Sequence, residues 1–169
     1  MQSSLKNVYV PGDVNGKNLL AHAAFKMGDI VASEIVEGKS DKYNNNIIPR
    51  AIYTYPEIGS VGLTEEEAKK SYDVKVGKFN YSANGRALAH GDSSGMVKII
   101  SDARYGEILG AHIVGPRASE LINEVSILMQ SEVIVEEAIK MVFGHPTFSE
   151  AIYEAIADVE GVSVHLPKK

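Results

Sequence analysis

Cysteine and tryptophan are absent from all 169 residues of this sequence. Without cysteine the chain has no disulfide, no thiolate nucleophile and no cysteine-ligated metal. No apolar stretch approaches the roughly 20 residues that a membrane-spanning helix needs. No Gly-x-Gly-x-x-Gly string occurs, so these residues cannot build the pyrophosphate cradle of a dinucleotide site. These absences exclude a thiol reaction centre, a membrane span and a complete dinucleotide-binding fold within these 169 residues.

The sequence also lacks a strong excess of either acidic or basic residues. The net charge is −5, and 17 basic and 22 acidic residues are mixed along the chain. This pattern offers no basic patch, so we expect neither nucleic acid nor a membrane surface as a partner. Met1 is followed by polar Gln2 and Ser3, which is not typical of a signal peptide. Hydrophobic residues at 44% predict a core-forming chain of about one domain with a short appendage.

The first part of the chain predicts a strand followed by a helix. Asn7–Pro11 is a short β-type run, and Leu19–Ile35 has helical periodicity. Gly38–Asn46 is polar and uneven in composition, which is typical of a linker. We therefore expect a small segment over residues 1–46 and a main domain over residues 47–169.

The main domain begins with strands and ends with helices. Its β-type runs are Pro49–Tyr55, Ile58–Leu63, Val74–Tyr81, Met96–Ser101 and Ile108–Val114. Its predicted helices are a short one opened by a capping box at Thr64, then Ala118–Met129, Glu136–Val142 and Glu150–Val159. This order favours an α+β fold, in which an antiparallel sheet carries helices packed on one face.

One string carries side chains suited to proton transfer. Histidine exchanges protons near neutral pH, and His145 is followed five residues later by Glu150. A carboxylate bonded to the distal ring nitrogen would fix the tautomer of the imidazole and raise its basicity. Thr147-x-x-Glu150 is also the pattern of a capping box, in which Glu150 would only satisfy a helix start. Spacing alone leaves both interpretations open.

The same string resembles the carboxy-terminal signature of the pyridine nucleotide–disulfide oxidoreductases. Further strings follow in the order of that family: YTYPE at 53–57, VGLTE at 61–65, the loop string NGRA at 84–87, GMVK at 95–98, ILGAH at 108–112 and GPRASELI at 115–122. The resemblance covers essentially the whole chain. It is closest to the dihydrolipoamide dehydrogenase branch, and the Ala21–His22 pair and the Leu166–Pro167 ending favour that branch over glutathione or mercuric reductases.

The resemblance implies a role for each member of the pair. His145 would handle the proton between dihydrolipoamide and a reactive cysteine pair, and Glu150 would orient and charge-stabilise its imidazole. In this family the pair acts across a homodimer interface, here through residues 47–169. One departure is Phe143–Gly144, where the family often has an earlier histidine and then alanine. The other histidines, His90, His112 and His165, show no metal-like pairing and no evident partner, and we expect them to be structural or solvated.

The front of the chain resembles the second flavin fingerprint of the same family. Gly12 and Asp13 alone would indicate a turn. Within the resemblance, Gly12 lets the backbone approach FAD closely, and Asp13 accepts hydrogen bonds from ribityl hydroxyls. Leu20, Ala21 and His22 match a helix start whose amide groups point at the flavin pyrimidine edge. Residues 1–46 would then be a strand–helix remnant of the FAD domain.

The implied parent enzyme uses FAD and NAD to convert dihydrolipoamide to lipoamide. It associates with 2-oxo-acid dehydrogenase complexes in the cytoplasm, or in the mitochondrial matrix of a eukaryote. We expect the 169 residues alone to be inactive and to bind neither cofactor tightly, because they lack the disulfide and the dinucleotide folds. The alternatives are a sibling disulfide reductase and a dimerisation module without catalysis.

Overall fold

The computed structural model describes residues 1–39 and 43–166. The chain divides into two compact units, Met1–Ile48 and Pro49–Lys169. The division falls two residues after the expected boundary at 46/47. Residues 40–42 of the predicted linker, and Pro167 of the ending that favoured the lipoamide branch, lie outside the described residues.

Unit 1 is built around one helix, α1 (Ala21–Glu37), preceded by the short 3-10 turn η1 (Asp13–Asn15). Ala23, Met27 and Ile30 are the buried residues of α1, and their spacing places them on one face. The predicted strand over Asn7–Pro11 is not formed, apart from one isolated antiparallel bridge between Gln2 and Tyr9. A strand needs a paired neighbour, and this bridge is the one such pairing among the described residues of unit 1.

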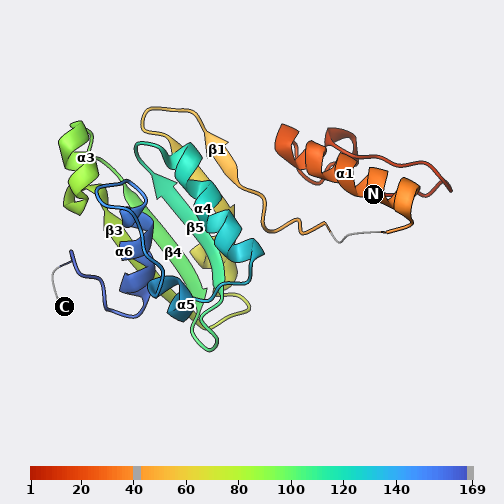
Figure 1. Ribbon diagram of the computed structural model, residues 1–169. Coiled ribbons are helices and arrows are strands. Elements are labelled where there is room, and N and C mark those ends of the chain that lie inside the picture. Colours follow the sequence, from red (N-terminus) through yellow and green to blue (C-terminus); the bar gives the residue numbers. More distant parts are fainter. Residues whose placement is uncertain (40–42, 167–169) are drawn as a thin grey trace. The chain divides into compact units, whose positions relative to one another are not determined.

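Unit 2 is an antiparallel five-stranded sheet in the order β1-β2-β5-β4-β3 (Figure 1). The strands are β1 (Arg50–Ile52), β2 (Ile58–Gly62), β3 (Val74–Asn80), β4 (Met96–Asp102) and β5 (Ile108–Val114). The predicted hairpin of β4 and β5 is confirmed, with Met96 opposite Val114 and Ile99 opposite Ala111. The predicted runs at 49–55 and 74–81 are longer than the strands that they contain. Alternating residues of β4, such as Val97 and Ile99, are fully buried.

The two longer helices of unit 2 cover one face of this sheet (Figure 1). Helix α4 (Ala118–Gln130) packs against β1, β2 and β5, and α6 (Glu150–Val159) packs against β3 and β4. Two strand glycines allow the close approach. A Cβ on Gly59 would overlap the Ala118 carbonyl oxygen, and one on Gly77 would overlap that of Ala155. The expected α+β fold with helices packed on one face is therefore confirmed.

Three short helices complete unit 2. They are α2 (Glu65–Ala68), α3 (Gly85–His90) and α5 (Val135–Ile139), and a 3-10 turn η2 (Tyr81–Ala83) precedes α3. The capping box predicted at Thr64 is confirmed. Expecting the NGRA string at 84–87 to be only a loop was wrong, because the Asn84 side chain accepts from the Ala87 amide and starts α3.

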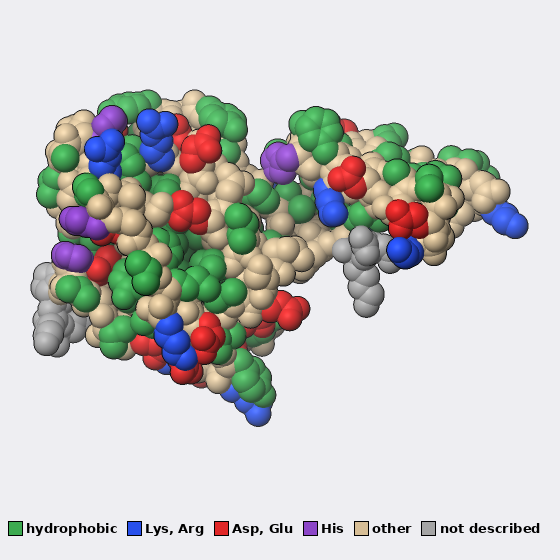
Figure 2. All heavy atoms as spheres, in the orientation of Figure 1, with side chains coloured by type: hydrophobic (Ala, Val, Ile, Leu, Met, Phe, Trp, Pro, Cys, Tyr) green, Lys and Arg blue, Asp and Glu red, His purple; other side chains and the backbone are tan. Residues whose placement is uncertain are grey.

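No helix among residues 1–39 and 43–166 is long and apolar enough to cross a membrane. On the face of unit 2 seen in Figure 2, acidic and basic side chains are interspersed and neither sign forms a continuous patch.

Candidate functional site

The fold places His145 and Glu150 in direct contact. His145 lies in the loop between α5 and α6, and Glu150 is the first residue of α6. The His145–Pro146 peptide is cis. His145 Nδ1 lies 2.7 Å from Glu150 Oε1. The other carboxylate oxygen, Oε2, accepts from the Thr147 amide at 2.8 Å. The pair anticipated from the sequence is therefore formed, with each oxygen of Glu150 in use.

This geometry fixes which ring nitrogen is available for chemistry. A carboxylate only accepts hydrogen bonds, so Nδ1 carries the proton and Nε2 holds the lone pair when the imidazole is neutral. The side chain of His145 is 75% exposed, whereas that of Glu150 is 21% exposed. A half-buried carboxylate thus orients an imidazole whose Nε2 remains accessible to a proton donor or acceptor. This arrangement suits general acid–base catalysis.

Of the two contacts that define a capping box at Thr147 and Glu150, the structure contains only one. Glu150 does accept from the Thr147 amide, but Thr147 Oγ1 donates to the Gly144 carbonyl at 2.7 Å. The N-cap position of α6 is Ser149, which makes no side-chain capping bond. The hydroxyl of Ser149 instead donates to Glu124 of α4 at 2.7 Å. Glu150 therefore both fastens the loop and holds the imidazole.

Aromatic packing fixes the same loop from another side. The Phe148 ring lies edge-to-face with Tyr81 at 6.2 Å and with His90 at 5.7 Å between centroids. Tyr81 is fully buried, and this burial raises the pKa of its phenol above the ordinary 10.0. The departure at Phe143 is accommodated by packing against Tyr153 of α6, with centroids 5.5 Å apart. The loop is thus held between η2, α3 and α6.

Sequence reasoning found no partner for His165, and this was wrong. His165 Nδ1 lies 2.7 Å from Glu154 Oε1, one turn beyond Glu150 on α6. Glu154 is 3% exposed and its Oε2 accepts from Ser163 Oγ and from the amides of Val164 and His165. Burial pushes the pKa of Glu154 upward, but these hydrogen bonds outweigh it and hold the pKa below the ordinary 4.5. An eleven-residue separation has no regular period, so only the fold reveals this second pair.

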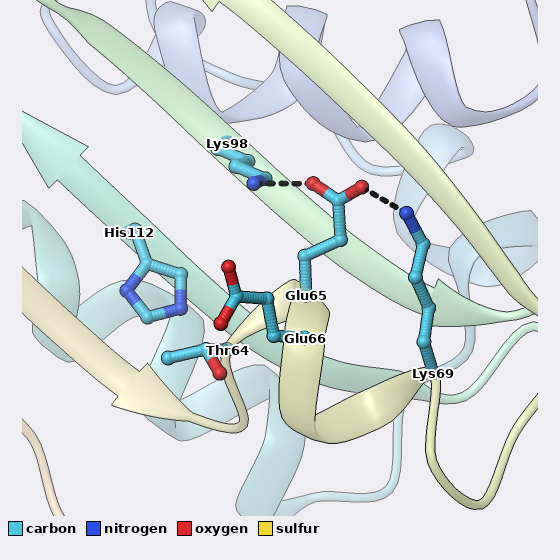
Figure 3. A pocket seen from close by; sticks show the side chains of 6 residues that line it. All are labelled: Thr64, Glu65, Glu66, Lys69, Lys98 and His112. Carbon is cyan, nitrogen blue, oxygen red and sulfur yellow. Dashed lines mark hydrogen bonds and ion pairs between the residues drawn. The ribbon is translucent and has the colours of Figure 1, made fainter.

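His112 belongs to a separate polar groove beside α2, with a volume of about 580 Å³ (Figure 3). Its Nε2 donates to the Leu63 carbonyl at 3.1 Å. Lys69 and Lys98 each donate to one oxygen of Glu65, lowering the pKa of that carboxyl to about 2. Glu66 also lines the groove, so its two lysines and two carboxylates balance in formal charge. Within residues 1–39 and 43–166, no group of three or more His, Asp or Glu is arranged to hold a metal ion.

The predicted flavin residues of unit 1 lie in two backbone segments, of which the first is a turn. Gly12 precedes η1 with φ of 81°, a conformation that favours glycine, and its amide lies 3.3 Å from Met27 Sδ of α1. Asp13 follows on the surface with an exposed carboxylate. The two residues form a tight turn that rests on α1 and leaves the Asp13 side chain outside.

The second segment, Leu20, Ala21 and His22, forms the amino-terminal end of α1. Leu20 is the N-cap residue and has extended backbone angles. Its aliphatic side chain cannot cap the first helical amides, and Ala21 and His22 are exposed. A polar atom placed there would meet backbone donors and the positive end of the helix dipole. The backbone donors at this helix start and the exposed Asp13 thus fit a ribityl chain and a flavin pyrimidine edge, whereas Gly12 itself is buried against α1. No described residue provides the glycine-rich cradle for a dinucleotide pyrophosphate.

Known proteins resemble this chain over nearly its whole length. The sequence profile described as "Pyridine nucleotide-disulphide oxidoreductase, dimerisation domain" matches residues 48–156. Dihydrolipoyl dehydrogenase from Bacillus subtilis is 42% identical over 166 residues, 98% of this chain and 36% of the relative. Dihydrolipoyl dehydrogenase from Halobacterium salinarum is 40% identical over 165 residues, 97% of this chain and 35% of the relative. The chain thus spans about 36% of the length of such relatives.

Solved structures agree in fold. LpdA from Mycobacterium tuberculosis superposes with a TM-score of 0.83 at 27% identity, over 89% of this chain and 33% of that structure. The HOCl-induced flavoprotein disulfide reductase RclA from Escherichia coli, as a Cu(II) complex, superposes with a TM-score of 0.84 at 27% identity. That match covers 94% of this chain and 36% of RclA.

Proposed function

The chain belongs to the pyridine nucleotide-disulphide oxidoreductase family, whose dimerisation domain it carries, and from that premise we propose that it supplies the acid–base pair and the dimer interface of a dihydrolipoamide dehydrogenase. The observation that carries the proposal is the contact of 2.7 Å between His145 and Glu150, with an exposed imidazole. An imidazole this exposed is free to face a second protein surface, which would complete the active site. In a homodimer that surface is the partner subunit.

In this mechanism His145 Nε2 accepts the proton of a dihydrolipoamide thiol. The thiolate then attacks a disulfide sulfur supplied by other residues, and the displaced sulfur leaves as a thiolate. Glu150 holds Nδ1–H and stabilises the imidazolium formed by the proton transfer. The pair therefore moves one proton and needs no change in its own oxidation state.

We extend the proposal to the flavin residues. Gly12 and Asp13 would accommodate the ribityl chain, and Leu20, Ala21 and His22 would present the helix terminus to the pyrimidine edge. FAD, when bound, would supply the electron acceptor, and NAD would be bound by residues outside this chain. As an isolated polypeptide the 169 residues should form no NADH from dihydrolipoamide and should bind FAD weakly. The implied setting is a 2-oxo-acid dehydrogenase complex in the cytoplasm or the mitochondrial matrix.

A chimera tests this function directly. Residues 1–169 would replace the matching segment of the Bacillus subtilis dihydrolipoyl dehydrogenase, which is 42% identical to them. We expect the chimera to form NADH from dihydrolipoamide, and His145→Gln to lower kcat by about 10²–10⁴-fold, as for loss of a general acid–base group. Glu136→Gln, at an exposed position of α5 in unit 2, serves as the control.

An active chimera that tolerates His145→Gln would contradict the assigned role. The same chimera assayed with glutathione disulfide tests the glutathione reductase alternative, because that enzyme acts on a different disulfide. A dimeric chimera that folds and turns over neither substrate would support the alternative of a dimerisation module.

A further inference from the structure

The NGRA string identified in the sequence begins with a buried residue that contacts the candidate catalytic loop. We propose that Asn84 is a positioning residue, which holds Thr147 so that Glu150 can orient His145. Asn84 touches no reacting atom, and its role rests on the proposed acid–base function of the pair.

Both the oxygen and the nitrogen of the Asn84 side-chain amide form hydrogen bonds. Oδ1 accepts from the Ala87 amide at 2.9 Å, and Nδ2 donates to the Thr147 carbonyl oxygen at 3.1 Å. Because the first partner is a donor and the second an acceptor, only one orientation of the amide satisfies both. Asn84 is 3% exposed, so water cannot easily replace either partner. One side chain thus starts α3 and ties the loop to it.

Thr147 passes this constraint to the pair. Its carbonyl accepts from Asn84, its amide donates to Glu150 Oε2 at 2.8 Å, and its hydroxyl donates to the Gly144 carbonyl. Glu150 Oε1 then meets His145 Nδ1. The chain of contacts therefore runs from Asn84 through Thr147 and Glu150 to the imidazole.

A second contact joins the same two segments. Phe148, next to Thr147, packs against Tyr81 and His90, which lie on the two sides of Asn84 in the sequence. This packing keeps the loop close to η2 and α3. The hydrogen bond from Asn84 adds a directional constraint, because it holds the carbonyl of the peptide that joins Thr147 to Phe148. The imidazole itself is 75% exposed and relies on Glu150 for its direction.

Two substitutions separate the roles of Asn84. Asn84→Asp keeps an oxygen for the Ala87 amide and remains a good N-cap, but it places a carboxylate against the Thr147 carbonyl oxygen. Asn84→Ala removes both contacts. The 169-residue chain is labelled with ¹⁵N, and NMR measures the tautomer of neutral His145 and the exchange rates of the Thr147 and Ala87 amides.

In the unmodified chain we expect neutral His145 to carry its proton on Nδ1. In Asn84→Asp the Thr147 amide should exchange about fivefold faster, which is the loss of about one hydrogen bond. The Nδ1–H tautomer should lose its predominance, and the exchange of the Ala87 amide should stay within about twofold, showing that α3 remains capped. In Asn84→Ala both amides should exchange faster. Thr64→Ala, which removes the cap of the remote α2, should leave His145 unchanged.

Glu150→Ala identifies which idea fails. If this variant changes the tautomer of His145 and Asn84→Asp does not, the positioning role is wrong and the proposed function stands. If Glu150→Ala also leaves the tautomer unchanged, the pair does not form in solution, and both proposals are overturned. Asn84→Asp retains the cap of α3 and so decides between these outcomes even if Asn84→Ala fails to fold.

Discussion

Glu150 serves two neighbouring donors with its two carboxylate oxygens. One meets His145 Nδ1–H and the other meets the Thr147 amide. A glutamine at this position has one oxygen and one NH₂ group, so one of the two donors would face another donor. The sequence left the catalytic pair and the capping box open as alternatives, whereas in the structure Glu150 contacts His145 and the Thr147 amide at the same time.

Glu150→Gln should therefore impair the chimera without unfolding it. We expect kcat for dihydrolipoamide to fall at least about 100-fold, because an orienting carboxylate is lost from a histidine-based site. Steady-state kinetics measures the effect. Glu136→Gln, at an exposed position of α5, is the control and should leave kcat unchanged. An equal kcat for Glu150→Gln and the unmodified chimera would contradict the orienting role.

The second His–Glu pair makes a prediction about stability and pH. Hydrogen bonds hold the pKa of Glu154 below its ordinary 4.5. The stabilisation from its charged form is therefore present above pH 4.5 and is lost as the pH falls through the lower folded-state pKa. We expect Glu154→Gln to reduce the free energy of unfolding by about 2 kcal/mol at about pH 7, and the difference to shrink as the solution is acidified.

Denaturant unfolding at several pH values measures this difference. Glu160→Gln is the matched control, since its ion pair with Lys75 is exposed and should contribute less than about 1 kcal/mol. A constant difference between Glu154→Gln and the unmodified chain from about pH 3 to about pH 7 would contradict the assignment.

At the scale of elements, the sequence predicted best the bounds of helices and strands whose apolar pattern continues over the whole element. Helix α6 has the predicted bounds Glu150–Val159, and β5 has the predicted bounds Ile108–Val114. Helix α3 escaped prediction because its six residues are too few for an apolar stripe. The contact between His165 and Glu154 escaped because the chain reverses at Gly161, which has φ of 69°. The glycine marks the end of α6 in the sequence, but no local pattern identifies Glu154 as the partner of His165.

The packing of α6 on β3 gives an element-scale prediction. An added Cβ at Gly77 would meet backbone atoms of Ala155 and Val159, which cannot move without shifting the helix. We expect Gly77→Ala to reduce the free energy of unfolding by about 3 kcal/mol. Gly85→Ala is the control, because nothing lies within 4 Å of the position that its methyl group would take, and it should be neutral or slightly stabilising. Thermal unfolding compares the two variants, and equal melting temperatures would contradict the packing.

Hydrogen exchange should distinguish α1 from α4. Helix α1 buries three residues, which are Ala23, Met27 and Ile30. Helix α4 buries six, which are Ala118, Leu121, Ile122, Val125, Ser126 and Met129. Because fewer apolar contacts hold α1, we expect its amides to exchange faster than those of α4 in the same chain. Equal protection of both helices would show that unit 1 is more stable than its small core implies.

At the scale of the whole molecule, the exposed apolar side chains of unit 2 are the main feature left to explain. Tyr53 is 83% exposed, Tyr55 is 88% exposed and Val142 is 97% exposed. Val142 lies in the loop that carries His145. A dimer interface that includes this loop would cover apolar surface and bring the imidazole to the partner subunit together.

Sedimentation of the 169-residue chain tests this association. We expect a homodimer at tens of micromolar, because the matched profile is a dimerisation domain. Val142→Lys should weaken the dimer about tenfold or more by placing a charge in the interface. Val36→Lys, at an 82% exposed position of unit 1, is the control and should not change association. A monomer at these concentrations would contradict an autonomous interface.

The close packing of α6 against Gly77 of β3 affects how variants of this protein are interpreted. Glu150 lies five residues before Ala155, which is about 7.5 Å along the helix axis. A bulky replacement at Gly77 would displace the helix as a rigid rod and carry Glu150 and Glu154 with it. In an activity screen, such a variant would lose activity as if an active-site residue had been replaced, although the substituted residue lies on a strand far upstream in the sequence. A map that classifies substitutions only by their distance from His145 would assign the wrong cause to the variant at Gly77.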